Sequence, residues 1–196
     1  ELLYSSSYFC YLGSDCTSSF YGKGKKKAWK LLMSFPQFIE SFSSLGRTFP
    51  PSDRLISQLS RFVCLLYGDE VSSNVNACRY NLFKLGQCSD DLLPPTYDSL
   101  VKHIERANFQ SAIWANCLLP NPVIPSPIGN GWKLCKGELE VVWMMHPPAP
   151  DSLLDCVNCK CKTGCQTQRC SCKKANLNST ELCSCCDCHS TASEIA

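Results

Sequence analysis

Residues 156–188 read CVNCKCKTGCQTQRCSCKKANLNSTELCSCCDC, and this stretch decides how the C-terminal part of the chain folds. Its apolar side chains are too few to form a hydrophobic core, so a covalent or coordinate bond has to hold it together. Three C-x-C pairs stand in it, at 159/161, 170/172 and 183/185. Its ten cysteines are candidate metal ligands: Cys156, Cys159, Cys161, Cys165, Cys170, Cys172, Cys183, Cys185, Cys186 and Cys188.

Disulfides and zinc are the two ways to hold such a segment, and the C-x-C spacing favours zinc. Cysteines two positions apart rarely bond each other because disulfide geometry is restrictive, whereas both sulfurs can reach one ion or neighbouring ions. The seven other cysteines are scattered among apolar stretches, as reduced thiols would be, and the total of 17 is odd. A disulfide-bonded tail and a metallothionein-like metal store are the alternatives.

The cysteine count permits two or three zinc ions. Eight thiolates would fill two separate tetrahedral sites. Three ions require twelve sulfur positions, which nine cysteines supply if three of them bridge two metals each. We therefore expect zinc as the cofactor, and the spacing alone leaves the number of ions open.

The same stretch, from Cys156 or Cys159 to Cys188, resembles a tesmin-type (CRC-type) CXC domain. It is also similar to the cysteine-rich modules that precede the catalytic domain of some histone methyltransferases. In the tesmin-type family nine cysteines hold three zinc ions and the module binds DNA. The implied ligands are Cys159, Cys161, Cys165, Cys170, Cys172, Cys183, Cys185, Cys188 and a residue at position 179.

This chain departs from the family pattern at two positions. Ser179 stands where the family has a ligand, so either a spare cysteine, Cys156 or Cys186, substitutes or the cluster loses a metal or is damaged. Arg169 replaces the tyrosine that usually precedes the fourth cysteine. An arginine there could still enter a minor groove of DNA.

Basic residues outnumber acidic ones in this stretch by five to two, which favours contact with DNA phosphates. The alternative is that some of these cations neutralise the charge of a zinc–thiolate cluster. The whole chain has a net charge of only +2, so affinity for nucleic acid has to come from local patches. The basic residues are Lys160, Lys162, Arg169, Lys173 and Lys174.

Helical periodicity runs through the first 119 residues and predicts an all-helical body. Its clearest helix is capped by Ser52, has apolar residues on one face from Leu55 to Leu66, and ends at Gly68. His103 lacks a Cys or Asp partner at metal spacing, so we expect a surface residue or a satisfied histidine. Further helices are expected over 1–12, 25–33, 36–45, 74–85 and 96–119.

Composition changes after Leu119, since seven of the twelve prolines fall between 120 and 150. An extended linker is expected there, followed by a β-hairpin in which Trp132 and Trp143 pair across the strands. A short helix at 150–156 would lead into the cysteines. The expected fold class is mainly α: a helical body, a proline-rich joint with a hairpin (131–135 with 138–144), and a small cysteine-rich zinc module. The expected divisions are 1–48, 49–119, 120–150 and 156–189.

Gly22-Lys23-Gly24 and the lysines that follow form a second candidate binding site. Two glycines let the backbone approach a phosphate closely, and a helix that begins at Lys25 would point its first amides at that anion. The alternative is a helix C-cap followed by a solvated basic face. The residues assigned to DNA binding here are Gly22, Gly24, Lys25 and Lys26.

The segment LGSDCTSSFYGKGKKKAWKLL, residues 12–32, is similar to the end of the nuclease core in flap-endonuclease and XPG-type enzymes. In those enzymes the glycine turn belongs to a helix–two-turn–helix element that grips duplex DNA. The aspartate is one of several carboxylates that hold two divalent metals. The resemblance rests on Gly13, Asp15, Gly22, Gly24, Lys26 and Ala28.

That resemblance implies a catalytic role for Asp15 as a ligand of a divalent metal such as Mg in the full-length protein. A two-metal phosphodiesterase needs several carboxylates. The others would lie upstream of Glu1, so Asp15 alone cannot carry out the reaction, and a turn or N-cap role is the alternative. The first residues read like the interior of a domain, and we expect this chain to be a fragment of a longer protein.

Together the two ends resemble the C-terminal part of uncharacterised, mobile-element-like invertebrate proteins. The leading functional prediction is a zinc-dependent DNA-binding protein of the nucleus, a reducing compartment, which by itself is not expected to be an enzyme. The alternative is the back end of a two-metal, structure-specific nuclease, and a third reading is metal storage or protein interaction. The sequence has no run of 18 apolar residues, so no membrane contact is expected.

Overall fold

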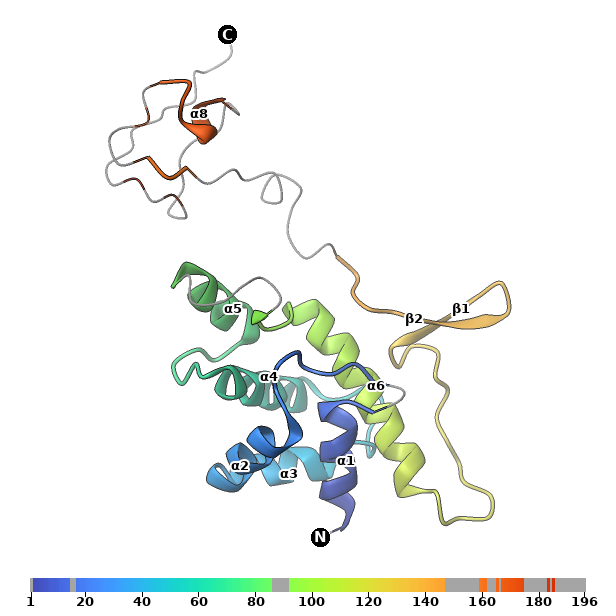
Figure 1. The fold of residues 1–196 in the computed structure, drawn as a ribbon. Helices are drawn as coiled ribbons and strands as arrows, with labels where there is room; N and C mark the ends of the chain where they lie inside the picture. The colour runs from blue at the N-terminus through green and yellow to red at the C-terminus, as the bar shows by residue number, and fades with distance from the viewer. Residues whose placement is uncertain are drawn as a thin grey trace. The chain divides into compact units, whose positions relative to one another are not determined.

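The structure, a computed structural model, describes residues 2–14, 17–85, 92–146, 159–161, 165, 167–174, 183 and 185. The chain divides into two units, Glu1–His146 and Pro147–Ala196 (Figure 1). The described residues of the first unit form six α-helices and one two-stranded sheet, so the expected mainly α class is confirmed. Among the described helices none has both the length and the apolar character that crossing a membrane requires.

The helices of the first unit begin and end close to the predicted residues. They are α1 (Leu2–Leu12), α2 (Lys25–Ser34), α3 (Gln37–Ser44), α4 (Asp53–Tyr67), α5 (Val75–Lys84) and α6 (Tyr97–Ala115). Ser52 caps α4 by accepting the Leu55 amide at 3.3 Å, and Gly68 ends that helix at a φ of 90°. Local capping chemistry therefore places the ends of α4 as predicted.

α6 stops four residues before the predicted end at Leu119. The carbonyl of Asn116 would need the amide of residue 120 to continue the helix, and Pro120 has no N–H. The Asn116 side-chain amide instead donates to the Ala112 carbonyl at 2.8 Å.

The core of the first unit is a cluster of aromatic rings between α1, α3 and α4. Phe42 makes edge-to-face contacts with Tyr8, Tyr11 and Phe62 at centroid distances of 5.3, 5.4 and 5.1 Å. Each such pair adds about 0.5–1.5 kcal/mol beyond the area it buries. From Leu59 onward α4 is buried on nearly every side, since Ser60 and Cys64 are covered as fully as its apolar residues.

The turn after α3 lies against the middle of α6. Gly46 has a φ of 83°, and a Cβ there would stand 2.6 Å from the backbone nitrogen of Ala112. The Gly46 amide donates to the Asn108 side-chain oxygen at 2.7 Å, and the Asn108 amide donates to the Thr48 carbonyl at 2.9 Å. A side chain on residue 46 would break this approach.

The predicted hairpin is present, as strands β1 (Trp132–Cys135) and β2 (Glu138–Val141). Lys136 and Gly137 form its two-residue turn with φ values of 51° and 86°, the left-handed pair of a type I′ turn. This turn fixes the register, so Trp132 faces Val141 and the predicted Trp132–Trp143 pair is wrong. Trp132 instead packs on Phe109 of α6 at 5.1 Å.

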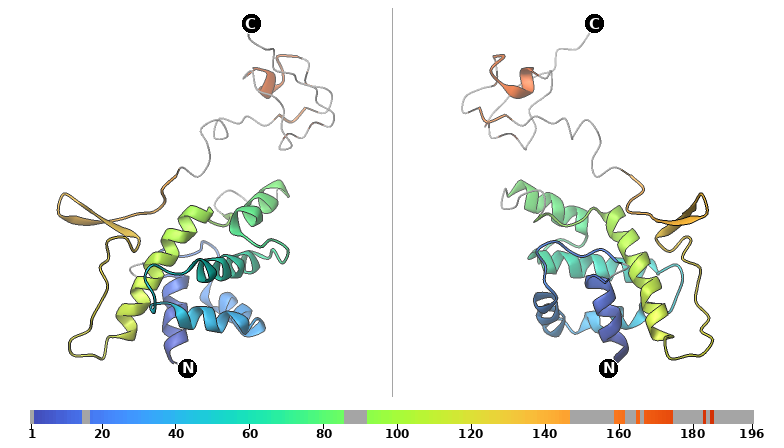
Figure 2. Two further views of the ribbon diagram at one scale, coloured as in Figure 1. Left: turned by 180° about the vertical axis from the view of Figure 1, so that it is seen from behind. Right: turned by 45° about the vertical axis from the view of Figure 1, so that its right-hand side comes forward.

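The hairpin and the segment after it are fastened along α6, and both views of Figure 2 show them beside that helix. Arg106 donates to the Val142 carbonyl at 2.6 Å, and its guanidinium lies 5.1 Å from the ring centroid of Trp143. Asp98 accepts the amides of Met145 and His146 at 2.6 and 2.8 Å. The expected helix at 150–156 lies outside the described residues.

Candidate metal centre

Local backbone conformation determines the direction in which the cysteine side chains of the second unit point. Cys159 and Cys161 belong to a non-helical segment, where side chains two residues apart can face the same side. Cys170 and Cys172 lie at the start of the one-turn helix α8 (Ser171–Lys174), where two residues correspond to about 200° of rotation. The first pair can therefore serve one centre, whereas the second pair points toward two.

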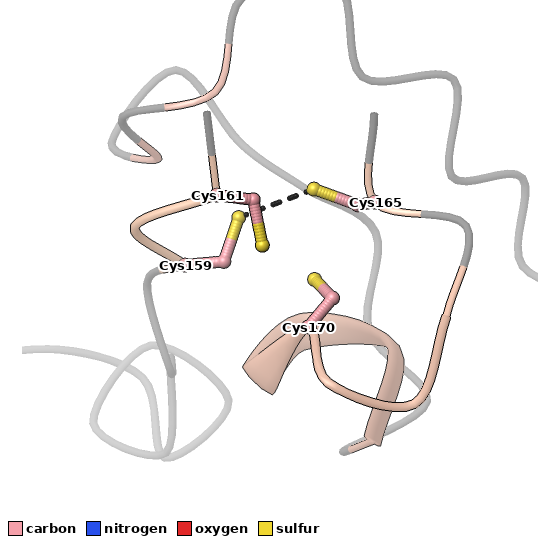
Figure 3. A group of neighbouring side chains, drawn as sticks. All are labelled: Cys159, Cys161, Cys165 and Cys170. Atoms are coloured by element: carbon pink, nitrogen blue, oxygen red, sulfur yellow. Dashed lines mark hydrogen bonds between the residues drawn. The ribbon is translucent and has the colours of Figure 1, made fainter. Parts of the chain in front are cut away.

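Four sulfurs form the first group (Figure 3). The Sγ atoms of Cys159, Cys161, Cys165 and Cys170 all lie within 4.8 Å of one another, and those of Cys159 and Cys165 are 3.4 Å apart. A tetrahedral zinc with Zn–S bonds of about 2.3 Å would separate its sulfurs by about 3.8 Å. Cys159, Cys165 and Cys170 are buried, and among the described residues only other cysteines pack against them. This group has the ligand number and spacing of a four-thiolate site.

A second group shares one sulfur with the first. Cys159, Cys172 and Cys183 have their Sγ atoms within 4.8 Å of one another, with Cys172 and Cys183 3.5 Å apart. The Sγ of Cys185 lies 3.5 Å from that of Cys159. Cys159 thus occupies the position of a thiolate that could bridge two metal ions.

The thiols of the two groups are not joined by disulfides, and they interact electrostatically with one another. The sulfur distances of 3.4–3.5 Å far exceed a disulfide bond of about 2.05 Å. Burial raises the pKa of Cys159, but hydrogen bonds from the Cys161 amide and from neighbouring thiols outweigh it and lower that pKa to about 5. Burial and the adjacent Cys183 raise the pKa of Cys172 to about 12. Cys159 is therefore the group that ionises first, and the thiols around it donate their protons in hydrogen bonds. A cation bound among these sulfurs would displace those protons.

The structure brings together seven of the ten predicted cysteine ligands, and these could hold a metal ion. They are Cys159, Cys161, Cys165, Cys170, Cys172, Cys183 and Cys185. Cys156, Cys186, Cys188 and Ser179 lie outside the described residues, so the source of the ninth ligand stays a prediction.

The predicted DNA-contacting residues of this unit are exposed around the buried sulfurs. Lys160 lies between two clustered cysteines, Arg169 directly precedes Cys170, and Lys173 and Lys174 follow Cys172. All four are exposed. Lys162 lies outside the described residues.

The glycine turn of the first unit has the expected backbone. Gly22 has a φ of 68°, and Gly24 precedes α2 in an extended conformation with no side chain capping the helix. Lys25 and Lys26 occupy the first turn and are exposed, and the described first turn contains no acidic residue. Asp15 lies outside the described residues, so its predicted catalytic role remains a prediction.

His103 is buried with both ring nitrogens bonded, which agrees with the expectation of a satisfied histidine. Its partner Ser18 lies 85 residues away, and nothing local in the sequence signals that pairing.

No protein-family model, no curated protein and no solved structure matches this chain. Functional assignment therefore rests on the chemistry of its residues.

Proposed function

We propose that the chain binds two or three zinc ions through its cysteine-rich unit and uses that unit to bind DNA. The observation that carries the proposal is the position of Cys159, whose sulfur belongs to both thiol groups. Sharing one thiolate lets two ions be held with fewer ligands than two separate sites need. Thiolates are soft ligands, and tetrahedral four-sulfur sites are typical of zinc.

The number of bound ions and the way they are released separate this proposal from metal storage. Ions joined through one thiolate stabilise each other, so a chelator should remove them together. A storage tail would hold many ions loosely and release them stepwise. Elemental analysis of the full chain during titration with a chelator measures the difference. Two or three ions lost in one step are expected, whereas stepwise release of a larger number contradicts the cluster.

Contact with DNA is supported by the four exposed cations that surround the cluster. A cluster of seven thiolates and two zinc ions carries a net charge of −3, because seven negative charges exceed four positive ones by three. Exposed cations around it therefore also offset the charge of the cluster, and the remaining positive surface faces solvent. Such a surface attracts phosphates without requiring a particular base sequence.

The glycine turn before α2 is proposed as a second phosphate contact. Its open backbone, its uncapped amides and the exposed Lys25 and Lys26 all suit an anion at the start of a helix. Zinc removal should abolish the contribution of the cysteine unit and leave this one. The same DNA-binding activity implies a nuclear location.

Binding of a labelled DNA duplex, followed by fluorescence anisotropy between 50 and 200 mM salt, tests these contacts. Each phosphate contact contributes about 0.9 to the slope of log affinity against log salt. Lys173→Gln should therefore reduce the slope by about 0.9, whereas Lys136→Gln, in the hairpin turn, should leave it unchanged. Binding to duplex that is insensitive to both salt and chelation would contradict the proposal.

A further inference from the structure

The fold of the first unit sets the tautomer of His103. Its Nε2 lies 2.7 Å from the carbonyl oxygen of Tyr11, and because a carbonyl only accepts, Nε2 carries the proton. Nδ1 then has a free lone pair and accepts the hydroxyl proton of Ser18, whose Oγ is 2.7 Å away. This is the tautomer in which His103 can take a proton from Ser18.

The imidazole is also fixed in orientation. Tyr11 and Phe20 make edge contacts with the His103 ring at 5.2 and 5.1 Å, and only 4% of the residue is exposed. A hydroxyl bonded to a base whose other nitrogen is held by a third group is the arrangement of an activated nucleophile. Here a backbone carbonyl holds the base in place of a carboxylate.

A cavity of about 240 Å³ adjoins this pair. Ser18 and His103 line it together with the aromatic side chains of Phe20, Tyr21, Tyr67 and Trp143. Arg106 and Asp98 contact the segment after β2 that contains Trp143. This segment therefore forms one wall of the cavity. No carboxylate is among the described lining residues, and the walls suit a small apolar or aromatic group.

We propose that Ser18 is a nucleophile activated by His103 and that the cavity accepts a short-chain or aromatic ester. The Ser18 oxygen would bond to the acyl carbon while its proton passes to Nδ1 of His103. The bond from that carbon to the leaving oxygen breaks, and the proton on Nδ1 passes to that oxygen to give the alcohol. The oxygen of a water molecule would then bond to the acyl carbon while a water proton passes to Nδ1 of His103. The bond from that carbon to the Ser18 oxygen breaks, and the proton on Nδ1 returns to that oxygen, to give the acid and free Ser18. This activity is independent of the cysteine unit.

Burial keeps His103 neutral. Burial lowers its pKa, the bond with the Tyr11 carbonyl raises it, and the nearby Arg106 lowers it, to about 4 in balance. The titratable groups around the ring and the cavity are the phenols of Tyr11, Tyr21 and Tyr67, with Lys23 over the Tyr67 ring. The lone pair on Nδ1 is therefore available across neutral pH. A weak base gives slow turnover, so a covalent adduct is the appropriate measurement.

A fluorophosphonate probe on the intact chain, with the labelled peptide identified by mass spectrometry, tests the proposal. Ser18 displaces fluoride from phosphorus and keeps the phosphonyl group, so the adduct accumulates. Ser18 should be labelled about 100-fold faster than the neighbouring exposed Ser19. The advantage should persist to about pH 5 and decline as His103 is protonated near pH 4.

Two variants and one control accompany this experiment. Ser18→Ala should abolish the adduct. His103→Gln can keep the bond to the Tyr11 carbonyl without a base toward Ser18, and should slow labelling about 100-fold. Ser34→Ala, whose hydroxyl bonds the Lys30 carbonyl on exposed α2, should change nothing. Equal labelling rates of Ser18 and Ser19 in the native chain would overturn the proposal. So would a labelling rate of Ser18 in the native chain that equals its rate in the urea-unfolded chain. Both comparisons use the native sequence, so neither depends on whether a variant folds.

Discussion

At the scale of single residues, Cys159 bears most on the proposed cluster because it is the sulfur common to both thiol groups. Cys159→Ser is expected to remove zinc from both groups. Cys161→Ser removes a ligand of the first group alone, and because the second ion then loses only the stabilisation from its neighbour, this variant should retain part of the zinc. Zinc per chain after dialysis, measured by elemental analysis, distinguishes the two variants. Cys135→Ser, in β1, is the control and should retain all the zinc. Equal losses from Cys159→Ser and Cys161→Ser would argue that no sulfur is shared.

Substitution of Gly46 and of Gly68 compares the cost of a steric clash with the cost of backbone strain alone. Both have left-handed φ values, 83° and 90°, but a Cβ at 46 would lie 2.6 Å from backbone while nothing lies within 4 Å at 68. Gly68→Ala should lower the free energy of unfolding by about 1 kcal/mol. Gly46→Ala should cost about 3 kcal/mol or more, because α6 has to shift. Urea unfolding followed by tryptophan fluorescence measures both, and equal costs would contradict the close approach of Gly46 to α6.

His103 predicts the response of the first unit to acid. Its folded pKa of about 4 lies below the ordinary 6.5, so the unfolded chain takes up a proton first as pH falls. Stability from this group is therefore complete above about pH 6.5 and declines until about pH 4, by about 3 kcal/mol. Asp69, whose pKa of about 2 is depressed mainly by hydrogen bonds from Ser72 and Val71 despite burial, acts only at lower pH.

Unfolding by urea at a series of pH values tests this window. His103→Gln should flatten the dependence between pH 6.5 and 4. A wild-type midpoint that stays constant from pH 6.5 to 4 would show that His103 is not held neutral.

At the scale of elements, α6 connects the separate parts of the first unit through three buried polar side chains. His103 bonds the end of α1, Arg106 bonds the hairpin segment, and Asn108 bonds the turn after α3. Buried polar groups with partners specify one arrangement of the elements, since any other would leave them unpaired. This explains why α6 carries polar residues on faces that a simple apolar pattern would assign to solvent.

The hairpin is held to α6 mainly by Trp132. Trp132→Ala should destabilise the first unit by about 1–3 kcal/mol through loss of its contact with Phe109. Leu134 lies on the same face of β1 but is 58% exposed, so Leu134→Ala should change stability by less than about 0.5 kcal/mol. A double-mutant cycle of Trp132→Ala with Phe109→Ala isolates the pairwise contact. Additive effects of those two substitutions would show that the hairpin does not dock through these rings.

The elements themselves were predictable because their signals are local. Ser52 and Gly68 bracket α4, and Lys136-Gly137 fixes a two-residue turn, so the helix and the hairpin follow from neighbouring residues. The tertiary contacts of the hairpin could not be predicted from neighbouring residues. Trp132 meets Phe109 and Trp143 meets Arg106 through tertiary packing, and Ser18 meets His103 across 85 residues.

The candidate metal site shows the same division between local and long-range signals. The C-x-C spacing predicts that the cysteines are metal ligands, but it treats 159/161 and 170/172 alike. In the structure the first pair serves one group, while Cys170 and Cys172 belong to different groups because a helical turn separates them. Backbone conformation, which spacing does not specify, decides which sulfurs meet.

At the scale of the whole molecule, the two units are held together by different physical means. The first has an aromatic core, and the described part of the second has buried sulfurs but no apolar core apart from them. Every tryptophan, tyrosine and phenylalanine of the chain precedes residue 147. Aromatic spectroscopy therefore reports the first unit alone, and spectroscopy of a bound metal reports the second alone.

Removal of metal should consequently unfold one unit and leave the other. Addition of a chelator to the full chain is expected to abolish the thiolate-to-metal absorption of a cobalt-substituted sample, because binding of the metal stabilises the second unit. Near-ultraviolet circular dichroism and the thermal midpoint seen by tryptophan fluorescence should stay unchanged, because the aromatic core contains no metal ligand. Oxidised protein provides the control, since disulfides would prevent cobalt from binding. A chelator that shifted the aromatic signals as well would show that the first unit depends on the metal, and the division of stability between core and cluster would then be wrong.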